Sequence, residues 1–339
     1  MSATTTEYTE VPFIKRVLQR REAGVFIALI VLCIIMRMSS EYFWTTKNMF
    51  NVLRNMSTIT IMAIGMTMII VTGGIDLSIG ATLAVSSMLA ARMMFPGGGT
   101  FLTGFSPWLA IPVGFLTGIG IGLVVGLIIT KLDVNPFITT LGMMSIGRGM
   151  TYLLATGIKG AVASNIAVKN PFIQYIGIGK LGPVPVQVVI MIILVTLFSL
   201  FIHYTVLGRQ IYAVGSNAEA ARLSGVNVDM VKIFVYTLTG FLCALAGFMN
   251  AGLVATAVTN AGVGSEMDVI AAVIIGGTSL SGGEGTIVGA VIGAAIMAVL
   301  KNAFVLLHLP VYLQTVSIGV VIILAVAIDG YRRRRAAAA

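Results

Sequence analysis

Residues that could carry out chemistry are sparse in this sequence, and they do not combine into a catalytic or metal-binding pattern. His203 and His308 are isolated, and neither has another His, Cys or acid at the spacing that metal ligands need. The sequence contains no Ser-His-Asp arrangement and no carboxylates paired for general acid and base catalysis. We therefore predict that the chain is not an enzyme and that it holds no metal or cofactor of its own.

Asp76 is an acid between two apolar runs, in the segment Thr72-Gly73-Gly74-Ile75-Asp76-Leu77-Ser78-Ile79-Gly80. An acid at the centre of a bilayer costs about 2.5–3.5 kcal/mol on insertion scales, so it must face a protein interior or a helix end. Two interpretations stay open. Asp76 lies beside a translocation path, or it is the N-cap of the next helix with help from Ser78.

The motif around Asp76 has a counterpart later in the chain. Gly73-Gly74-Ile75-Asp76-Leu77-Ser78 resembles Gly276-Gly277-Thr278-Ser279-Leu280-Ser281, and each follows an apolar run. Transporters often contain repeats with broken helices near the substrate path, so we take Ser78, Ser279 and Ser281 with Asp76 as candidate path or gate residues. Both motifs fall on the same side of the membrane in the span count below, which does not fit an inverted pair.

Residues 280–284 read Leu-Ser-Gly-Gly-Glu, which is similar to the signature loop of ABC ATPases. An ATPase also needs a P-loop of the form Gly-x4-Gly-Lys-Ser/Thr, and the sequence has none. We predict that this chain does not bind ATP and that these glycines permit a sharp helix break or close packing.

Residues 216–225 predict a short capped helix in a polar connection. Ser216 or Asn217 can cap its N-terminus, Glu219 complements the helix dipole and Gly225 can end it. A membrane protein has little need of such a helix unless another protein docks on it. The alternative is an ordinary solvated connector.

The composition places these residues in a membrane. The 339-residue chain is 58% hydrophobic and only 10% charged, with a mean hydropathy of +1.02, whereas soluble domains carry roughly 25% charged residues. We predict an all-α integral membrane protein with about ten spans, some of them broken at glycines. The spans are expected near residues 23–41, 52–72, 77–95, 107–130, 137–157, 185–204, 231–256, 267–281, 286–305 and 311–328.

The distribution of Lys and Arg predicts that both termini are cytoplasmic, because more of them fall on that side of the ten spans. This gives a cytoplasmic segment over 1–22, one transmembrane domain over 23–330 and a basic cytoplasmic tail over 331–339. Within the domain we expect an external loop at 157–184 and a cytoplasmic loop at 205–230. The net charge of +9 sits at segment ends, which argues against a nucleic-acid partner.

Three further sites have structural interpretations. Asn135 can cap a helix that starts with Pro136. Arg148 lies in an apolar segment and needs a partner, so we expect a structural ion pair or a snorkelling anchor. Glu266 and Asp268 fall at an external helix start, where the dipole favours acids.

The chain resembles the ribose/galactose-type permeases of bacterial ABC importers over roughly residues 25–330. The stretches that carry this resemblance are Gly65-Met66-Thr67 and residues 73–80, 136–142, 208–226, 268–273 and 276–283. Each is weak alone, and together they are specific.

The resemblance implies a multi-pass subunit of the bacterial inner membrane that imports a monosaccharide or related polyol. It implies two permease chains per complex, a cytoplasmic ATPase that binds ATP and Mg²⁺, and a periplasmic sugar-binding protein. The residues expected to couple to the ATPase are Glu219, Ala220, Ala221, Arg222 and Gly225. Those expected to face the binding protein are Lys159, Lys169, Glu266 and Asp268.

Two rival classes remain, an ion-coupled secondary sugar carrier and a passive channel or structural membrane subunit. A secondary carrier needs acids at a midplane site, for which Asp76 is the candidate. Both rivals leave the capped helix at 216–225 unexplained. The sequence leaves open which sugar is carried and whether the second permease chain is a copy or a paralogue.

Overall fold

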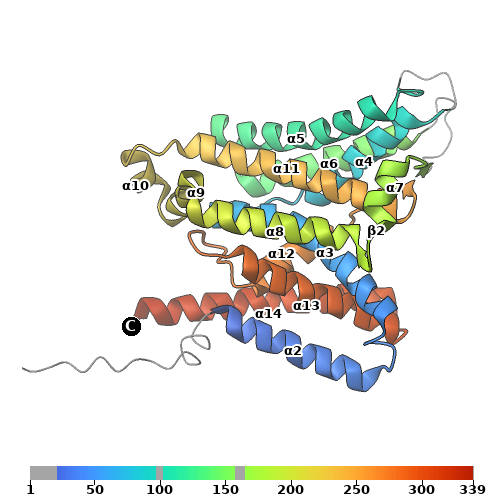
Figure 1. The fold of residues 1–339 in the computed structure, drawn as a ribbon. Coiled ribbons are helices and arrows are strands. Elements are labelled where there is room, and N and C mark those ends of the chain that lie inside the picture. Colours follow the sequence, from blue (N-terminus) through green and yellow to red (C-terminus); the bar gives the residue numbers. More distant parts are fainter. Residues whose placement is uncertain (1–20, 97–101, 157–164, 339) are drawn as a thin grey trace, which may run out of the picture.

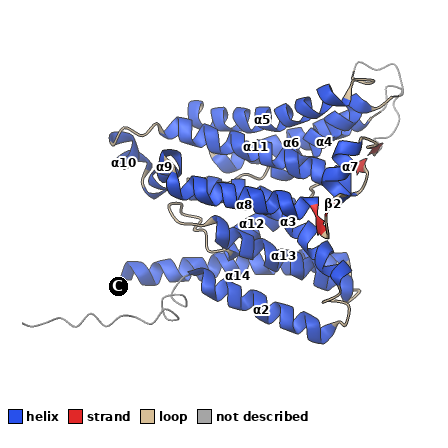
Figure 2. Cartoon of the chain, viewed as in Figure 1, coloured by secondary structure: helices blue, strands red, loops and turns tan. Residues whose placement is uncertain are grey.

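The computed structural model describes residues 21–96, 102–156 and 165–338, and most of them belong to helices (Figures 1 and 2). The helices are α2 (Arg21–Ser39), α3 (Thr46–Val71), α4 (Ile79–Met94), α5 (Pro107–Lys131), α6 (Pro136–Ala155), α7 (Pro171–Ile178), α8 (Val186–Tyr204), α9 (Val206–Ser216), α10 (Ala218–Leu223), α11 (Val228–Leu253), α12 (Ser265–Ile275), α13 (Ile287–Leu306) and α14 (Val311–Ala338). Two antiparallel pairs of very short strands join β1 (Ile166–Ala167) to β4 (Thr256–Ala257) and β2 (Lys180–Leu181) to β3 (Val184–Pro185).

Within these residues, five helices are long and apolar enough to cross a membrane, namely α3, α5, α8, α11 and α13. Shorter apolar stretches lie in α2, α4 and α14. The predicted segments at 137–157 and 267–281 correspond to α6 and α12, and α12 is shorter than expected because the chain turns at Gly276 and Gly277. The mainly helical membrane fold is therefore as predicted, apart from the two short strand pairs, while helix length does not fix the number of crossings.

Helix α3 is the centre of the bundle. Its apolar window is 78% buried inside the chain, against 33% for α5 and for α8, so α3 packs on protein while those two present most of their surface outward. In Figure 1, α4, α5, α6 and α11 gather on one side of α3, and α2, α13 and α14 gather on the other.

Side-chain caps fix several helix starts, as their sequences predict. Asn135 Oδ1 accepts a hydrogen bond from Phe137 N at 2.9 Å ahead of Pro136, which confirms the expected cap of α6. Asn170 begins α7 in the same way, with bonds from Phe172 N and Ile173 N at 3.0 and 3.1 Å. Proline fits the first turn because its missing amide proton has no helical acceptor there.

A glycine stripe joins α5 to α11. Gly114, Gly118, Gly122 and Gly126 recur every fourth residue, and a Cβ on each would crowd α11. A Cβ on Gly126 would lie 2.9 Å from the backbone Cα of Ile233, and one on Gly118 would lie 2.8 Å from Ala244 Cβ. Small residues at this spacing let two helix backbones approach closely, which is the usual basis of packing in a membrane.

Two long helices are each followed by an irregular segment and a shorter helix. Helices α3 and α11 both have 26 residues, and they lead to α4 with 16 and α12 with 11. The starts of the two short helices meet, since a Cβ on Gly262 would lie 3.1 Å from Gly80 Cα. The paired interruptions are therefore residues 72–78 and 254–264, and not the two similar glycine motifs.

Both polar connections contain more structure than the sequence suggested. The expected external loop at 157–184 includes α7, whose Ile173 is buried and whose Gly177 packs against Gly252 of α11. The expected cytoplasmic loop at 205–230 contains α9 as well as the predicted short helix α10. Helix α14 continues through the predicted basic tail as far as Ala338.

Candidate functional site

The predicted capped helix is α10, at the end of the bundle where α9 and the C-terminus also lie (Figure 1). Asn217, and not Ser216, is its cap, and Asn217 Oδ1 accepts from Glu219 N at 3.0 Å and from Ala220 N at 2.9 Å. Gly225 ends the turn that follows with a φ of +86°, a backbone conformation that residues with a Cβ rarely adopt.

The faces of α10 differ from the sequence expectation. Ala221 was expected to contact the ATPase, but only 5% of its surface is exposed and it packs in the core beside α9 and α11. The outer face instead carries Leu223, which is 86% exposed, next to the exposed Glu219 and Ala220. Leu223 was missed because its position on the outer face depends on which side of α10 packs on the bundle.

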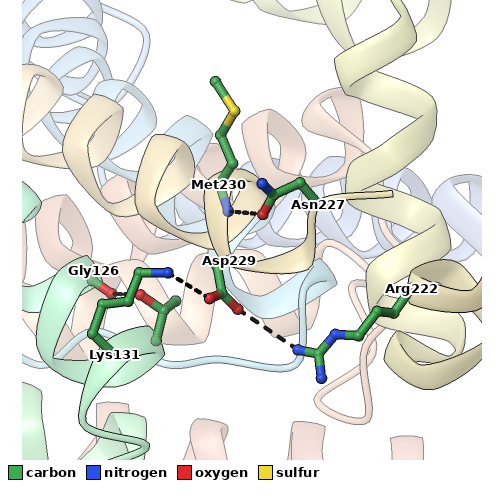
Figure 3. A network of polar contacts seen from close by, with 7 residues as sticks. Gly126, Lys131, Arg222, Asn227, Asp229 and Met230 are labelled. Atoms are coloured by element: carbon green, nitrogen blue, oxygen red, sulfur yellow. Dashed lines mark hydrogen bonds and ion pairs between the residues drawn. The ribbon is translucent and has the colours of Figure 1, made fainter. Parts of the chain in front are cut away.

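Asp229 joins α5, α10 and α11 through its contacts with Lys131 and Arg222 (Figure 3). Lys131 Nζ at the end of α5 donates to Asp229 Oδ2 at 2.8 Å, and Arg222 Nη2 of α10 lies 3.6 Å from Asp229 Oδ1. The Arg222 guanidinium thus points toward Asp229, and its side chain remains 70% exposed. Exposed ion pairs of this kind contribute about 0–1 kcal/mol each, so their role is to orient α10 more than to stabilise it.

The two similar glycine motifs lie at the same end of the bundle as α10. Gly283 N donates to Val71 O at 2.8 Å, which joins the turn after α12 to the end of α3. Ser279 is buried, and its Oγ accepts from Ser281 N at 3.3 Å, while Ser281 is exposed. The Leu280–Glu284 turn therefore packs on the backbone of this chain.

Asp76 is buried at the interruption between α3 and α4, with 4% of its surface exposed. Its Oδ1 accepts from Ser78 N at 2.7 Å and from Ser78 Oγ at 2.6 Å. These bonds form a turn ahead of the helix. The suggested N-cap role is wrong in detail, because Ser78 occupies the cap position of α4 and makes no side-chain cap bond.

Two charged side chains, Arg148 and Glu266, lie where α4 and α12 begin. Arg148 Nη1 of α6 donates to Ala261 O at 2.6 Å. A Cβ on Gly80 would lie 2.8 Å from Glu266 Oε2 and 3.2 Å from Arg148 Nη2, so both charges flank this glycine. Arg148 therefore reaches inward to the loop before α12, which excludes the snorkelling interpretation.

The four residues expected to face a binding protein have separate environments. Lys169 is exposed, whereas Glu266 is half-buried beside Gly80. Asp268 is buried and accepts a hydrogen bond from Lys301 Nζ of α13, so its carboxylate is not available at a surface. Lys159 lies outside the described residues.

Comparison with known proteins decides the family. The family model described as branched-chain amino acid transport system / permease component matches residues 48–326. The chain belongs to this permease family.

Similar curated proteins agree with that assignment. The chain is 41% identical over 307 residues to the ribose import permease protein RbsC of Escherichia coli K12, covering 91% of this chain and 93% of the relative. It is 40% identical to RbsC of Bacillus subtilis, covering 91% and 92%. It is 35% identical to the fructose import permease protein FrcC of Rhizobium meliloti, covering 87% and 81%. No solved structure matches.

These comparisons confirm the resemblance to sugar-type permeases of ABC importers drawn from the sequence. The chain is a multi-pass protein of the inner membrane and a transporter subunit.

Proposed function

We propose that this chain forms the membrane path of an ATP-driven importer for a monosaccharide such as ribose or fructose. The relatives that cover about nine-tenths of the chain are import permeases for these sugars. The observation that carries the proposal is α10, a capped helix that projects an exposed leucine and an exposed acid from one end of the bundle.

In this proposal α10 docks into a groove of a cytoplasmic ATPase subunit that carries two cassettes. Glu219, Ala220, Arg222 and Gly225 shape the contact, and Leu223 is its apolar anchor, because docking would remove its exposed apolar surface from water. Ala221 supports the helix from inside. ATP and Mg²⁺ bind the partner subunit, where the P-loop resides.

The orientation follows from that docking. The end of the bundle with α9, α10 and the C-terminus faces the cytoplasm, and the chain crosses the membrane about ten times with both termini inside. The opposite end, with α7 and the β2–β3 turn, faces a periplasmic sugar-binding protein. Lys169, which is exposed just before α7, belongs to that side.

The path lies between two permease chains, each a copy of this one or one copy with a paralogue. Asp76 and Ser78 lie in the interruption between α3 and α4, and Ser279 and Ser281 lie in the turn between α12 and α13; both segments would move during transport. Asp76 accepts two hydrogen bonds from Ser78 and so holds the turn ahead of α4. The external protein supplies most of the sugar affinity.

The test is uptake of labelled ribose, fructose and leucine in cells that express this chain with its ATPase and binding protein. We expect a monosaccharide to accumulate, uptake to survive a protonophore while ATP is maintained, and replacement of the P-loop lysine of the ATPase to abolish it. The matched control is the same cell without this chain.

The chain would be a secondary carrier if uptake were lost with the proton or sodium gradient and were unchanged by the substitution in the ATPase. Accumulation of leucine without any sugar would show that the substrate is the one in the family description and not that of the sugar-import relatives.

A further inference from the structure

The end of α9 touches backbone that lies directly beside both glycine motifs, at Val71 and at Gly282 and Gly283. A Cβ on Gly215 would overlap Val71 O at the end of α3 and would lie 2.6 Å from Gly283 N. One on Gly282 would lie 2.8 Å from Gly215 O and 3.2 Å from Gly73 N, and one on Gly283 would lie 2.8 Å from Ser216 Oγ. Three separate segments therefore meet mainly through backbone atoms, with Ser216 Oγ beside them.

Hydrogen bonds hold this junction of α9, α3 and the turn after α12. Gly283 N donates to Val71 O at 2.8 Å, and Tyr212 Oη of α9 donates to Gly285 O at 2.7 Å. Gly282 and Gly283 have φ values of +84° and +74°, which lets the turn present its amides to α3.

The junction is one residue away from α10. Helix α9 ends at Ser216 and α10 begins at Ala218, with Asn217 capping α10 in between. A displacement of α10 therefore moves Gly215 and Ser216 directly. Backbone packed on backbone has no rotamers to absorb the movement, because packed interiors shift as units.

The segments that leave the junction are the interrupted helices. Residues 72–78 lead from it to the start of α4, where Gly80 lies against Gly262 and between Arg148 and Glu266. The turn at 276–286 joins α12 to α13. The junction therefore holds the end of α3 against the turn between α12 and α13, and it is connected to the start of α4 through residues 72–78.

We infer that Gly215, with Gly282 and Gly283, positions the interrupted helices for transport by carrying the movement of α10 into both of them. This inference rests on the proposed function. Gly215, Gly282 and Gly283 are positioning residues, and neither ATP nor sugar touches them.

The decisive variant is Gly215→Ala in the complete complex with ATPase and binding protein. Gly215 lies in a helix without a positive φ, so alanine suits its backbone and only the contact with Val71 and Gly283 is disturbed. The control is Gly120→Ala in α5, where nothing lies within 4 Å of the added Cβ. A milder variant, Tyr212→Phe, keeps the packing and removes the bond to Gly285 O.

We expect Gly215→Ala to retain the ATPase subunit and its ATP hydrolysis but to lower sugar uptake per ATP about tenfold, and Tyr212→Phe to lower it about threefold. Gly120→Ala should match wild type. The inference is overturned if Gly215→Ala matches Gly120→Ala, or if it loses uptake only because the ATPase subunit dissociates.

If Gly215→Ala does not assemble, Tyr212→Phe decides, and an unchanged ratio of uptake to ATP hydrolysis contradicts the inference. Failure of the proposed function would give a different result, because the wild-type complex itself would then show no ATP-dependent uptake.

Discussion

The side-chain oxygen of Asn217 satisfies two backbone amides at the start of a helix with only six residues. A helix this short is not stable alone, because nucleation is unfavourable and few hydrogen bonds follow it. Its cap and its packing on the bundle through Ala221 must therefore supply most of its stability.

Replacing Asn217 by alanine should fray α10. Loss of a cap costs about 1 kcal/mol, which corresponds to about fivefold faster hydrogen exchange at the amides of Glu219 and Ala220. Exchange measured by mass spectrometry on the purified protein checks this. Asn217→Asp keeps the acceptor and adds a charge that the helix dipole favours, so it should exchange like wild type. Equal exchange in both variants would show that the cap does not hold the helix.

For single residues, the sequence predicted the caps of α10 but not which face of α10 packs on the bundle. Asn217 and Gly225 could be predicted because capping depends on residues only a few positions apart. The burial of Ala221 and the exposure of Leu223 could not, since they depend on contacts with α9 and α11. The Arg148 bond to Ala261 joins positions 113 residues apart, which no local pattern encodes.

Helices α5 and α11 pack through backbone contact along the glycine stripe. The four-residue spacing of these glycines is visible in the sequence and is typical of close helix pairs. The partner helix is not visible there, because any helix with a small or flat face could fill that role.

Gly122→Leu should separate α5 from α11. A Cβ at this position would already lie 2.9 Å from Tyr236 C and 3.0 Å from Thr237 Cα, and neither backbone atom can move aside. We expect a loss of about 3 kcal/mol in stability from overpacking. This should lower Tm in detergent by about 5 °C.

Gly120→Leu is the matched control, because the space around Gly120 is open and the same leucine is added to the same helix. If both leucine variants lowered Tm equally, the cause would be the added side chain itself and not contact with α11.

Other elements show where sequence patterns compete with tertiary packing. The two Gly-Gly motifs were predicted to break the chain, and α3 and α12 do end beside them, whereas the span predicted to reach residue 256 ends at Leu253. Helix α9 was missed because two glycines and an arginine gave it the composition of a loop, while burial of Ile211 and Val214 makes it a helix in the folded chain.

For the whole molecule, composition predicted the helical class and the membrane location, but it did not predict which helices pack on one another. The burial of α3 at the centre and the meeting of α4 with α12 depend on long-range packing. The similar glycine motifs were expected on one side, and they do lie at one end of the bundle, where Gly283 beside the second motif donates a hydrogen bond to Val71 O beside the first.

The central claim is that α10 is the surface on which an ATPase subunit docks, and co-purification of that subunit with Leu223→Asp tests it most directly. Leu223 is 86% exposed, so aspartate should leave the fold of this chain intact while placing a charge in an apolar contact. The control is Leu181→Asp, which alters a residue 60% exposed in the turn at the opposite end of the bundle (Figure 1).

We predict that Leu223→Asp weakens retention of the ATPase subunit by about thirtyfold, as expected for loss of a strong interface anchor. Leu181→Asp should retain the ATPase subunit as wild type does. Equal retention by Leu223→Asp and wild type would contradict the docking of α10 and remove the main structural support for an ATP-driven permease.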